Sequence, residues 1–206
     1  AITSSVLEGV EKVLVKEKPD LVLVHGDTTT SFAAALAAFY QQVPVGHVEA
    51  GLRTYDKYSP FPEEINRSLI GRIAELHFAP TEHNKENLNR ENIKENVFVT
   101  GNTVIDAFQT TVNPDYIFKD RTLRKLDFKK KRCVLVTAHR RENLGSPLEN
   151  ICHAIRRLAD RYKDMVFVYP VHLNPAVRKT ADQALGDLAN VYLIPPVDVE
   201  DMHNVL

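Results

Sequence analysis

The sequence alternates between short apolar segments and longer segments with apolar residues at helical spacing, and this alternation restricts the possible folds most. Residues 20–25 (Asp-Leu-Val-Leu-Val-His) are apolar on both faces, as is typical of a strand buried in a parallel sheet. The same reasoning predicts strands at 20–25, 44–48, 76–79, 96–100, 132–137, 165–170 and 190–194. It predicts helices at 3–17, 30–42, 63–75, 82–91, 103–111, 147–163 and 174–185. Such a pattern indicates the α/β class, with doubly wound parallel sheets and helices on both faces.

A basic segment interrupts the alternation. Pro114 is followed by a run of lysines and arginines with scattered apolar residues. We interpret residues 113–131 as a linker region between two domains. Residues 1–112 would then be the latter part of a first domain, and residues 132–206 the front part of a second. The alternative is a solvated surface helix within a single domain.

The length of the chain fits this division. Its 206 residues are many for one domain and few for two, because domains usually contain about 100–150 residues. The chain starts at Ala1 within a predicted helix, its first methionine is Met165, and a new helix begins just before Leu206. We therefore expect a central piece of a longer protein, with both domains incomplete.

The composition argues against several classes of protein. Hydrophobic residues make up 44% and charged residues 26%, which are ordinary values for a globular protein. The formal charge of -1 disfavours a nucleic-acid-binding domain, and the sequence lacks an apolar run of about 18 residues that would indicate a transmembrane helix. We expect Cys133 and Cys152 to be reduced thiols in a cytoplasmic protein. Neither a CxxC nor an HExxH motif is present, so we predict no metal site.

Acidic residues follow the first two predicted strands. Ligands of such folds bind at the edge where the parallel strands end. Asp27 lies directly after the first strand and Glu49 at the end of the second, so the two carboxylates should converge there. The alternative for Asp27 is a helix cap. His25 and His47 precede these acids, and we favour a core position for both.

A third carboxylate, Glu63, opens the helix that follows a proline-rich loop. It would lie near the same edge if that helix begins at Pro62. The alternative interpretation is also common, because acidic residues in the first turn of a helix are favoured by its dipole.

Basic residues follow the strands of the second half. His139, Arg140 and Arg141 come after the strand at 132–137, and His172 comes after the strand at 165–170. Arginine forks bind phosphate oxygens in a bidentate way, and histidine transfers protons near neutral pH. We predict that this cluster faces the three carboxylates across a cleft between the domains. A charge cluster at a helix start is the alternative.

Six segments, taken in order, resemble the UDP-N-acetylglucosamine 2-epimerase family. Each is a weak signal alone, but together they span almost the whole chain. They are His25-Gly-Asp-Thr-Thr-Thr30, Gly46-His-Val-Glu-Ala-Gly-Leu-Arg-Thr54, Ser59-Pro-Phe-Pro-Glu-Glu-Ile-Asn-Arg67, Phe98-Val-Thr-Gly-Asn-Thr-Val-Ile-Asp106, Thr137-Ala-His-Arg-Arg-Glu-Asn-Leu-Gly145 and Tyr169-Pro-Val-His-Leu-Asn-Pro175.

The resemblance implies a fold and a set of site residues. It implies two Rossmann-like domains in the arrangement called GT-B. Asp27, Glu49, Glu63 and His139 match the family's catalytic positions. The positions expected to bind substrate are Arg140, Arg141, Glu142, Asn143 and His172. The family's N-terminal Gly-Thr-Arg-Pro-Glu loop and its later Ser-Gly-Gly turn, which help to hold UDP, are not in this sequence.

The resemblance also implies a reaction. The non-hydrolysing members interconvert UDP-GlcNAc and UDP-ManNAc by expelling and re-adding UDP through a 2-acetamidoglucal intermediate, with no metal or NAD. The implied partners are UDP-GlcNAc, as substrate and allosteric activator, and a second copy in a homodimer. The implied role is in synthesis of cell-envelope polysaccharide. Two alternatives stay open: a hydrolysing enzyme that releases ManNAc and UDP, and a nucleotide-sugar-binding module without turnover.

Overall fold

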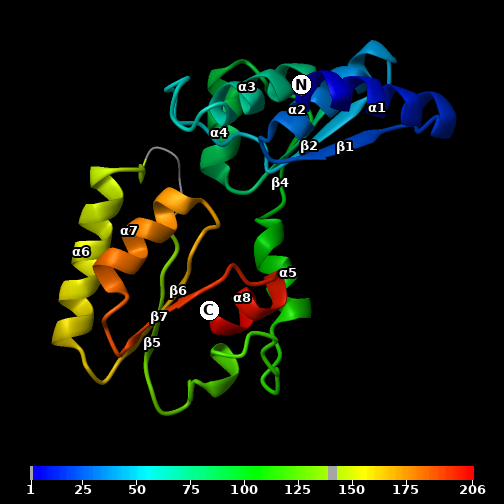
Figure 1. Cartoon of the computed structure of the whole chain (residues 1–206). Helices are drawn as coiled ribbons and strands as arrows, with labels where there is room; N and C mark the ends of the chain where they lie inside the picture. The colour runs from blue at the N-terminus through cyan, green and yellow to red at the C-terminus, as the bar shows by residue number, and fades with distance from the viewer. Residues whose placement is uncertain (1, 139–142) are drawn as a thin grey trace. The chain divides into compact units, whose positions relative to one another are not determined.

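The computed structural model describes residues 2–138 and 143–206 and divides the chain into two compact units, Ala1–Ala107 and Phe108–Leu206. Each unit contains one parallel sheet with helices packed against it (Figure 1). The predicted α/β class with parallel sheets is therefore confirmed. No helix among the described residues is long and apolar enough to cross a membrane.

The first unit contains a four-stranded sheet in the order β1-β2-β3-β4, all parallel. Because the order runs in one direction, every described strand of this sheet ends at the same edge, and the connecting helices return on the same side. The elements are α1 (Ile2–Glu17), β1 (Val22–His25), α2 (Thr29–Tyr40), β2 (Val45–Val48), α3 (Glu63–Ile73), β3 (Leu76–Ala79), α4 (Glu82–Arg90), β4 (Val97–Val99) and α5 (Thr103–Thr111).

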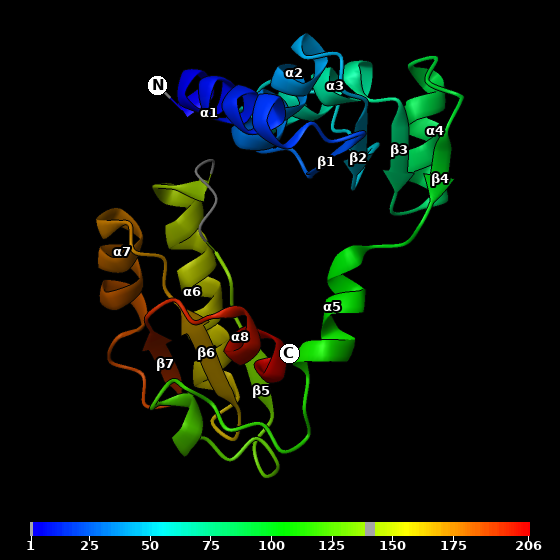
Figure 2. The same ribbon diagram turned by 90° about the vertical axis from the view of Figure 1, so that its right-hand side faces the viewer.

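Helices α1, α2 and α3 lie on the same side of this sheet (Figure 2). Val24 and Val45 point toward them and form a core with the small residues of α2 and with Ile70 of α3. The other face of the sheet is apolar and open. Leu23 is 60% exposed and Phe98 48%. The first unit as described is therefore covered by helices on one face, whereas the sequence pattern predicted helices on both.

The second unit contains a three-stranded parallel sheet in the order β5-β6-β7. Helices α6 and α7 pack on one face around Phe167 and Tyr169 of the central strand. The other face carries Val168, which contacts α8 and a short 3-10 helix. The elements are η1 (Leu123–Lys125), β5 (Cys133–Leu135), α6 (Ser146–Arg161), β6 (Val166–Pro170), α7 (Pro175–Leu185), β7 (Val191–Ile194) and α8 (Val199–Val205). Both faces of this sheet are thus covered.

Residues 113–131, which we predicted to be a linker region, pack onto the second sheet. Leu123 is fully buried against Val168 and Ile194. The buried carboxylate of Asp201, on α8, accepts hydrogen bonds from the Tyr116 hydroxyl and from the backbone amides of residues 119 and 120, at 2.8–2.9 Å. These contacts attach the segment to the second unit. The domain limits at 112 and 131 stay predictions.

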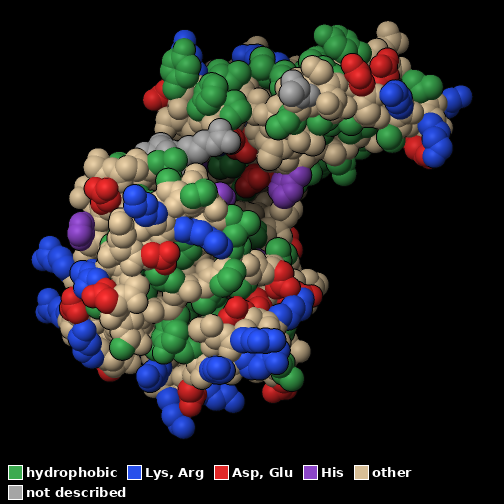
Figure 3. Space-filling view, in the orientation of Figure 1, with side chains coloured by type: hydrophobic (Ala, Val, Ile, Leu, Met, Phe, Trp, Pro, Cys, Tyr) green, Lys and Arg blue, Asp and Glu red, His purple; other side chains and the backbone are tan. Residues whose placement is uncertain are grey.

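Charged side chains of both signs are interspersed over the visible surface of the second unit (Figure 3). Lysines and arginines do not form one continuous stripe on the face shown there.

Candidate active site

The turn between β1 and α2 places Asp27 at the edge where the strands of the first sheet end. Gly26 takes a φ of 73°, a left-handed conformation that favours glycine. Thr28 then caps α2, because its hydroxyl accepts a hydrogen bond from the Ser31 amide at 3.1 Å. The capping role that we considered for this turn therefore belongs to Thr28, and the Asp27 carboxylate is not used for it.

Glu49 leaves β2 beside this turn. Its φ of 69° is unusual for a residue other than glycine. The Oε2 atom of Glu49 packs against Gly26. A Cβ atom on residue 26 would lie 3.3 Å from that oxygen. The same oxygen lies 3.5 Å from Nε2 of His25, whose side chain is 61% exposed. The core position that we favoured for His25 is therefore wrong, because its strand position faces the open side of the sheet.

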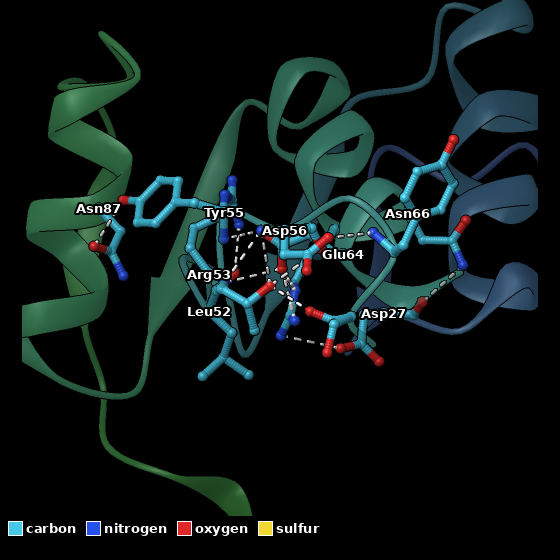
Figure 4. Close-up of polar contacts among 12 residues, drawn as sticks. Asp27, Leu52, Arg53, Tyr55, Asp56, Glu64, Asn66 and Asn87 are labelled. Atoms are coloured by element: carbon cyan, nitrogen blue, oxygen red, sulfur yellow. Dashed lines mark hydrogen bonds and ion pairs between the residues drawn. The ribbon is translucent and has the colours of Figure 1, made fainter. Parts of the chain in front are cut away.

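A buried ion pair on α3 contacts Asp27 (Figure 4 labels Asp27 and Glu64). Arg67 lies 2.7 Å from Oε2 of Glu64 and 3.4 Å from Oδ2 of Asp27. Glu64 also accepts hydrogen bonds from the backbone amides of Thr54 and Tyr55, at 2.9–3.1 Å. Since Arg67 and Glu64 are both buried, this pair holds its geometry far better than a surface pair would.

The environment raises the pKa of the Asp27 carboxyl and lowers that of Glu64. Burial raises the pKa of Asp27, Arg67 opposes that rise, and the neighbouring acids Glu63 and Glu64 add to it. Burial also pushes the pKa of Glu64 upward, but the amides of Thr54 and Tyr55 and the charge of Arg67 outweigh it and leave the pKa lowered. Asp27 is thus the carboxyl with the shift expected of a proton carrier, whereas Glu64 stays ionised.

Glu63 is the first residue of α3 and is partly exposed. It precedes Glu64, whose ion-pair partner Arg67 also contacts Asp27, and its charge adds to the raised pKa of Asp27. The first unit therefore brings Asp27, Glu49 and Glu63 to one edge of one sheet. That arrangement could move protons to and from a ligand bound there.

His47 lies in the core of the first unit, as we predicted, and is 0% exposed. Burial lowers its pKa to about 4, which is partly opposed by a hydrogen bond to the Gly26 carbonyl at 2.8 Å. His77, its partner on β3, is also buried, and its pKa is lowered for the same reason. Both rings are therefore neutral at neutral pH.

The predicted residues of the second half are described in part. His139, Arg140, Arg141 and Glu142 lie outside the described residues. Asn143 is partly exposed, just before α6. His172 follows β6, and its Nδ1 atom accepts a hydrogen bond from the Asn174 amide at 3.1 Å. The predicted cleft between the two halves stays a prediction.

Sequence reasoning missed the residues that support the site: Glu64, Asn66 and Arg67. A carboxylate and an arginine three positions apart on a helix usually form a surface pair, so the pattern alone does not indicate burial. The proline-rich loop before α3 could have indicated a buried acceptor such as Glu64, because the backbone amides of a packed loop need hydrogen-bond acceptors. Across residues 2–138 and 143–206, no group of three or more His, Cys, Asp or Glu side chains is placed to hold a metal ion.

Comparison with known proteins places these residues in a family. A family model described as UDP-N-acetylglucosamine 2-epimerase matches residues 1–206. The UDP-N-acetylglucosamine 2-epimerase of Bacillus subtilis is 55% identical over 204 residues, which are 98% of this chain and 53% of that protein. The chain thus spans about half the length of the curated relatives that it matches.

Two solved structures give the same result. The S. aureus MnaA-UDP co-structure is 55% identical with a TM-score of 0.92, over 98% of this chain and 55% of the other. The UDP-GlcNAc 2-epimerase of Neisseria meningitidis, bound to UDP-GlcNAc, is 47% identical with a TM-score of 0.90, over 98% of this chain and 56% of the other. These similarities confirm the GT-B-like α/β fold, of which the chain holds about half.

Proposed function

The chain belongs to the UDP-N-acetylglucosamine 2-epimerase family, and from this membership we propose that it is part of an enzyme that interconverts UDP-GlcNAc and UDP-ManNAc. The observation that carries the proposal is the position of Asp27, Glu49 and Glu63, which all lie at the edge where the strands of the first sheet end. The relatives bound to UDP and to UDP-GlcNAc support the same substrate for this chain.

The reaction requires a base and an acid on opposite faces of C2, and carboxylates at this edge can supply both. The hydrogen on C2 of the sugar is not next to a carbonyl, so its direct removal is very slow. Loss of UDP first breaks the C1–O bond and leaves positive charge on the ring, after which the C2 proton is acidic enough to be taken. Its removal gives 2-acetamidoglucal. Re-addition of UDP at C1, with a proton delivered to the other face of C2, completes the inversion.

The residues divide this work between them. Asp27, Glu49 and Glu63 supply the base and the acid on opposite faces of C2 and stabilise the oxocarbenium-like charge. The raised pKa of Asp27 suits a group that both takes and gives a proton. His139, Arg140 and Arg141 bind and assist the departing diphosphate. Glu142, Asn143 and His172 complete the substrate site.

The test uses the protein encoded by the complete reading frame that contains this chain. UDP-GlcNAc is incubated with it in D₂O, and the products are followed by proton NMR and chromatography. We expect UDP-ManNAc with deuterium at C2, because the proton lost at that carbon exchanges with solvent. Free ManNAc and UDP as main products would indicate the hydrolysing reaction instead. Binding of UDP-GlcNAc with no product would indicate a binding module.

We also propose three properties of the complete protein that follow from its family. It is a homodimer, it is cytoplasmic, and UDP-GlcNAc activates it in addition to serving as its substrate. Two free cysteines, one buried and one half-buried, suit a reducing compartment. Light scattering coupled to gel filtration tests the dimer. A sigmoidal dependence of the forward rate on the concentration of UDP-GlcNAc tests the activation. The rate of the reverse reaction, with UDP-ManNAc as the varied substrate, is measured beside it.

A further inference from the structure

Three successive carbonyls at residues 25–27 each accept a hydrogen bond from a side chain of a different element. Ser31 of α2 donates through its hydroxyl to the first carbonyl at 2.6 Å. His47 of β2 donates through Nε2 to the second at 2.8 Å, and Asn66 of α3 donates through Nδ2 to the third at 2.9 Å. We call these three side chains the carbonyl clamp. They fix the backbone of the turn that carries Asp27 (Figure 4 shows Asn66 beside it).

Two members of the clamp are buried polar side chains. Asn66 is 6% exposed and His47 is 0% exposed. A carbonyl can only accept, so Nε2 of His47 carries the proton. Nδ1 of the neutral ring has no hydrogen-bond partner in the part of the chain that the structure describes. Among the described residues, the side chain of His47 therefore makes one hydrogen bond, to the Gly26 carbonyl.

The clamp acts at the point where the turn would otherwise move. Gly26 has the conformational freedom of a glycine, and it lies against the Glu49 carboxylate. Rotation about Gly26 would change the distance between the carboxylates of Asp27 and Glu49. Because proton transfer at C2 needs both groups in place at once, a displacement of about 1 Å is enough to slow it strongly.

We propose that His47 and Asn66 are positioning residues for the epimerisation, which hold the Asp27 turn through its carbonyls and touch neither substrate nor reacting atoms. This rests on the proposed function. The clamp holds the backbone of Asp27, whereas Arg67 contacts its carboxylate at 3.4 Å, at the other end of the residue.

A matched pair of variants at His47 tests the proposal in the complete protein. Glutamine can place its amide nitrogen near the position of Nε2, whereas the shorter asparagine reproduces the position of Nδ1, which makes no bond here. We expect H47N to lower kcat about 10- to 100-fold, because a catalytic group displaced by about 1 Å loses rate on that scale. We expect KM to change less than about threefold. We expect H47Q to restore most of that loss. Equal losses in both variants, or no loss in either, would overturn the proposal.

A second measurement does not depend on activity. Hydrogen exchange of peptides covering residues 22–32 should be faster in H47N than in H47Q and in the wild-type protein, with the exchange of α6 unchanged as an internal control. If H47N does not fold, N66A is compared with the wild type in the same two measurements, and the same pattern is expected. An inactive wild type would contradict the proposed function, while equal exchange rates in all variants would contradict the clamp.

Discussion

At the scale of single residues, the candidate site depends on carboxyls that differ in their surroundings. Asp27 is partly buried and faces two other acids, so the protonated form of its side chain is favoured more than usual. Glu64, one position after Glu63, is held ionised by amides and by Arg67. Neighbouring acids in the sequence thus have different roles, which their order in the chain does not reveal.

We expect D27N, E49Q and E63Q each to reduce turnover by about 10²- to 10⁴-fold in the complete protein, which is the usual scale for a general acid or base. The rate of UDP-ManNAc formation at saturating UDP-GlcNAc measures the effect. E86Q is the matched control, since Glu86 is an exposed residue of α4 paired with Arg90. Wild-type rates in all three carboxylate variants would remove these residues from the mechanism.

Glu64 should make stability depend on pH. Its pKa in the folded protein lies below the ordinary value of 4.5, so its stabilising contribution is present above pH 4.5 and is lost as the pH falls below it. We expect E64Q to lower the free energy of unfolding by about 3 kcal/mol at pH 7, because Arg67 loses its buried partner. In urea unfolding series, the difference from wild type should shrink below pH 4.5. A difference that is constant from pH 7 to pH 3 would contradict this assignment.

At the scale of elements, the sequence predicted the order of helices and strands well. Periodicity located β3 at Leu76–Ala79 and α5 at Thr103–Thr111 without error, because both are bounded by clear turn signals. Local pattern could not show which face of a strand is covered, so His25 was assigned to the core. It also could not show the burial of Glu64 and Arg67, since only tertiary packing distinguishes a buried pair from a surface pair.

The segment at 113–131 was the least predictable element. Its basic residues suggested a solvated region, yet its scattered apolar residues Phe118, Leu123, Leu126 and Phe128 all pack against the second sheet. The spacing of these four matches neither a strand nor a helix, because most of the segment is irregular. The spacing of apolar residues therefore could not predict the packing of this segment.

We expect L123A to destabilise the second unit by about 3 kcal/mol, because it removes a fully buried side chain from the contact with Val168 and Ile194. Hydrogen exchange in peptides from β6 and β7 should accelerate, while β1 and β2 in the first unit stay unchanged. L173A, at a leucine that is 63% exposed, is the control. If L123A had no effect on the second unit, residues 113–131 would be a linker as first predicted.

At the scale of the whole molecule, each unit has its own core and its own part of the predicted site. The first unit holds the three carboxylates and the carbonyl clamp. The second holds His172 and Asn143. The open apolar face of the first sheet, with Leu23 and Phe98, contrasts with the second sheet, which is covered on both faces. The relatives are about twice as long as this chain, so the described residues amount to half of a family member.

This leads to a prediction for the 206-residue chain by itself. We expect it to bind UDP-GlcNAc weakly or not at all and to form no detectable UDP-ManNAc, because it spans only about half the length of its relatives, although the three carboxylates lie within it. Calorimetric titration with UDP-GlcNAc, run beside the NMR assay, measures both properties, and the complete protein is the positive control. Circular dichroism and thermal unfolding establish first that the shorter chain is folded. Turnover by the folded 206-residue chain would show that the strand-edge carboxylates and the second unit are sufficient for the reaction, and that the remaining half of the protein serves another purpose.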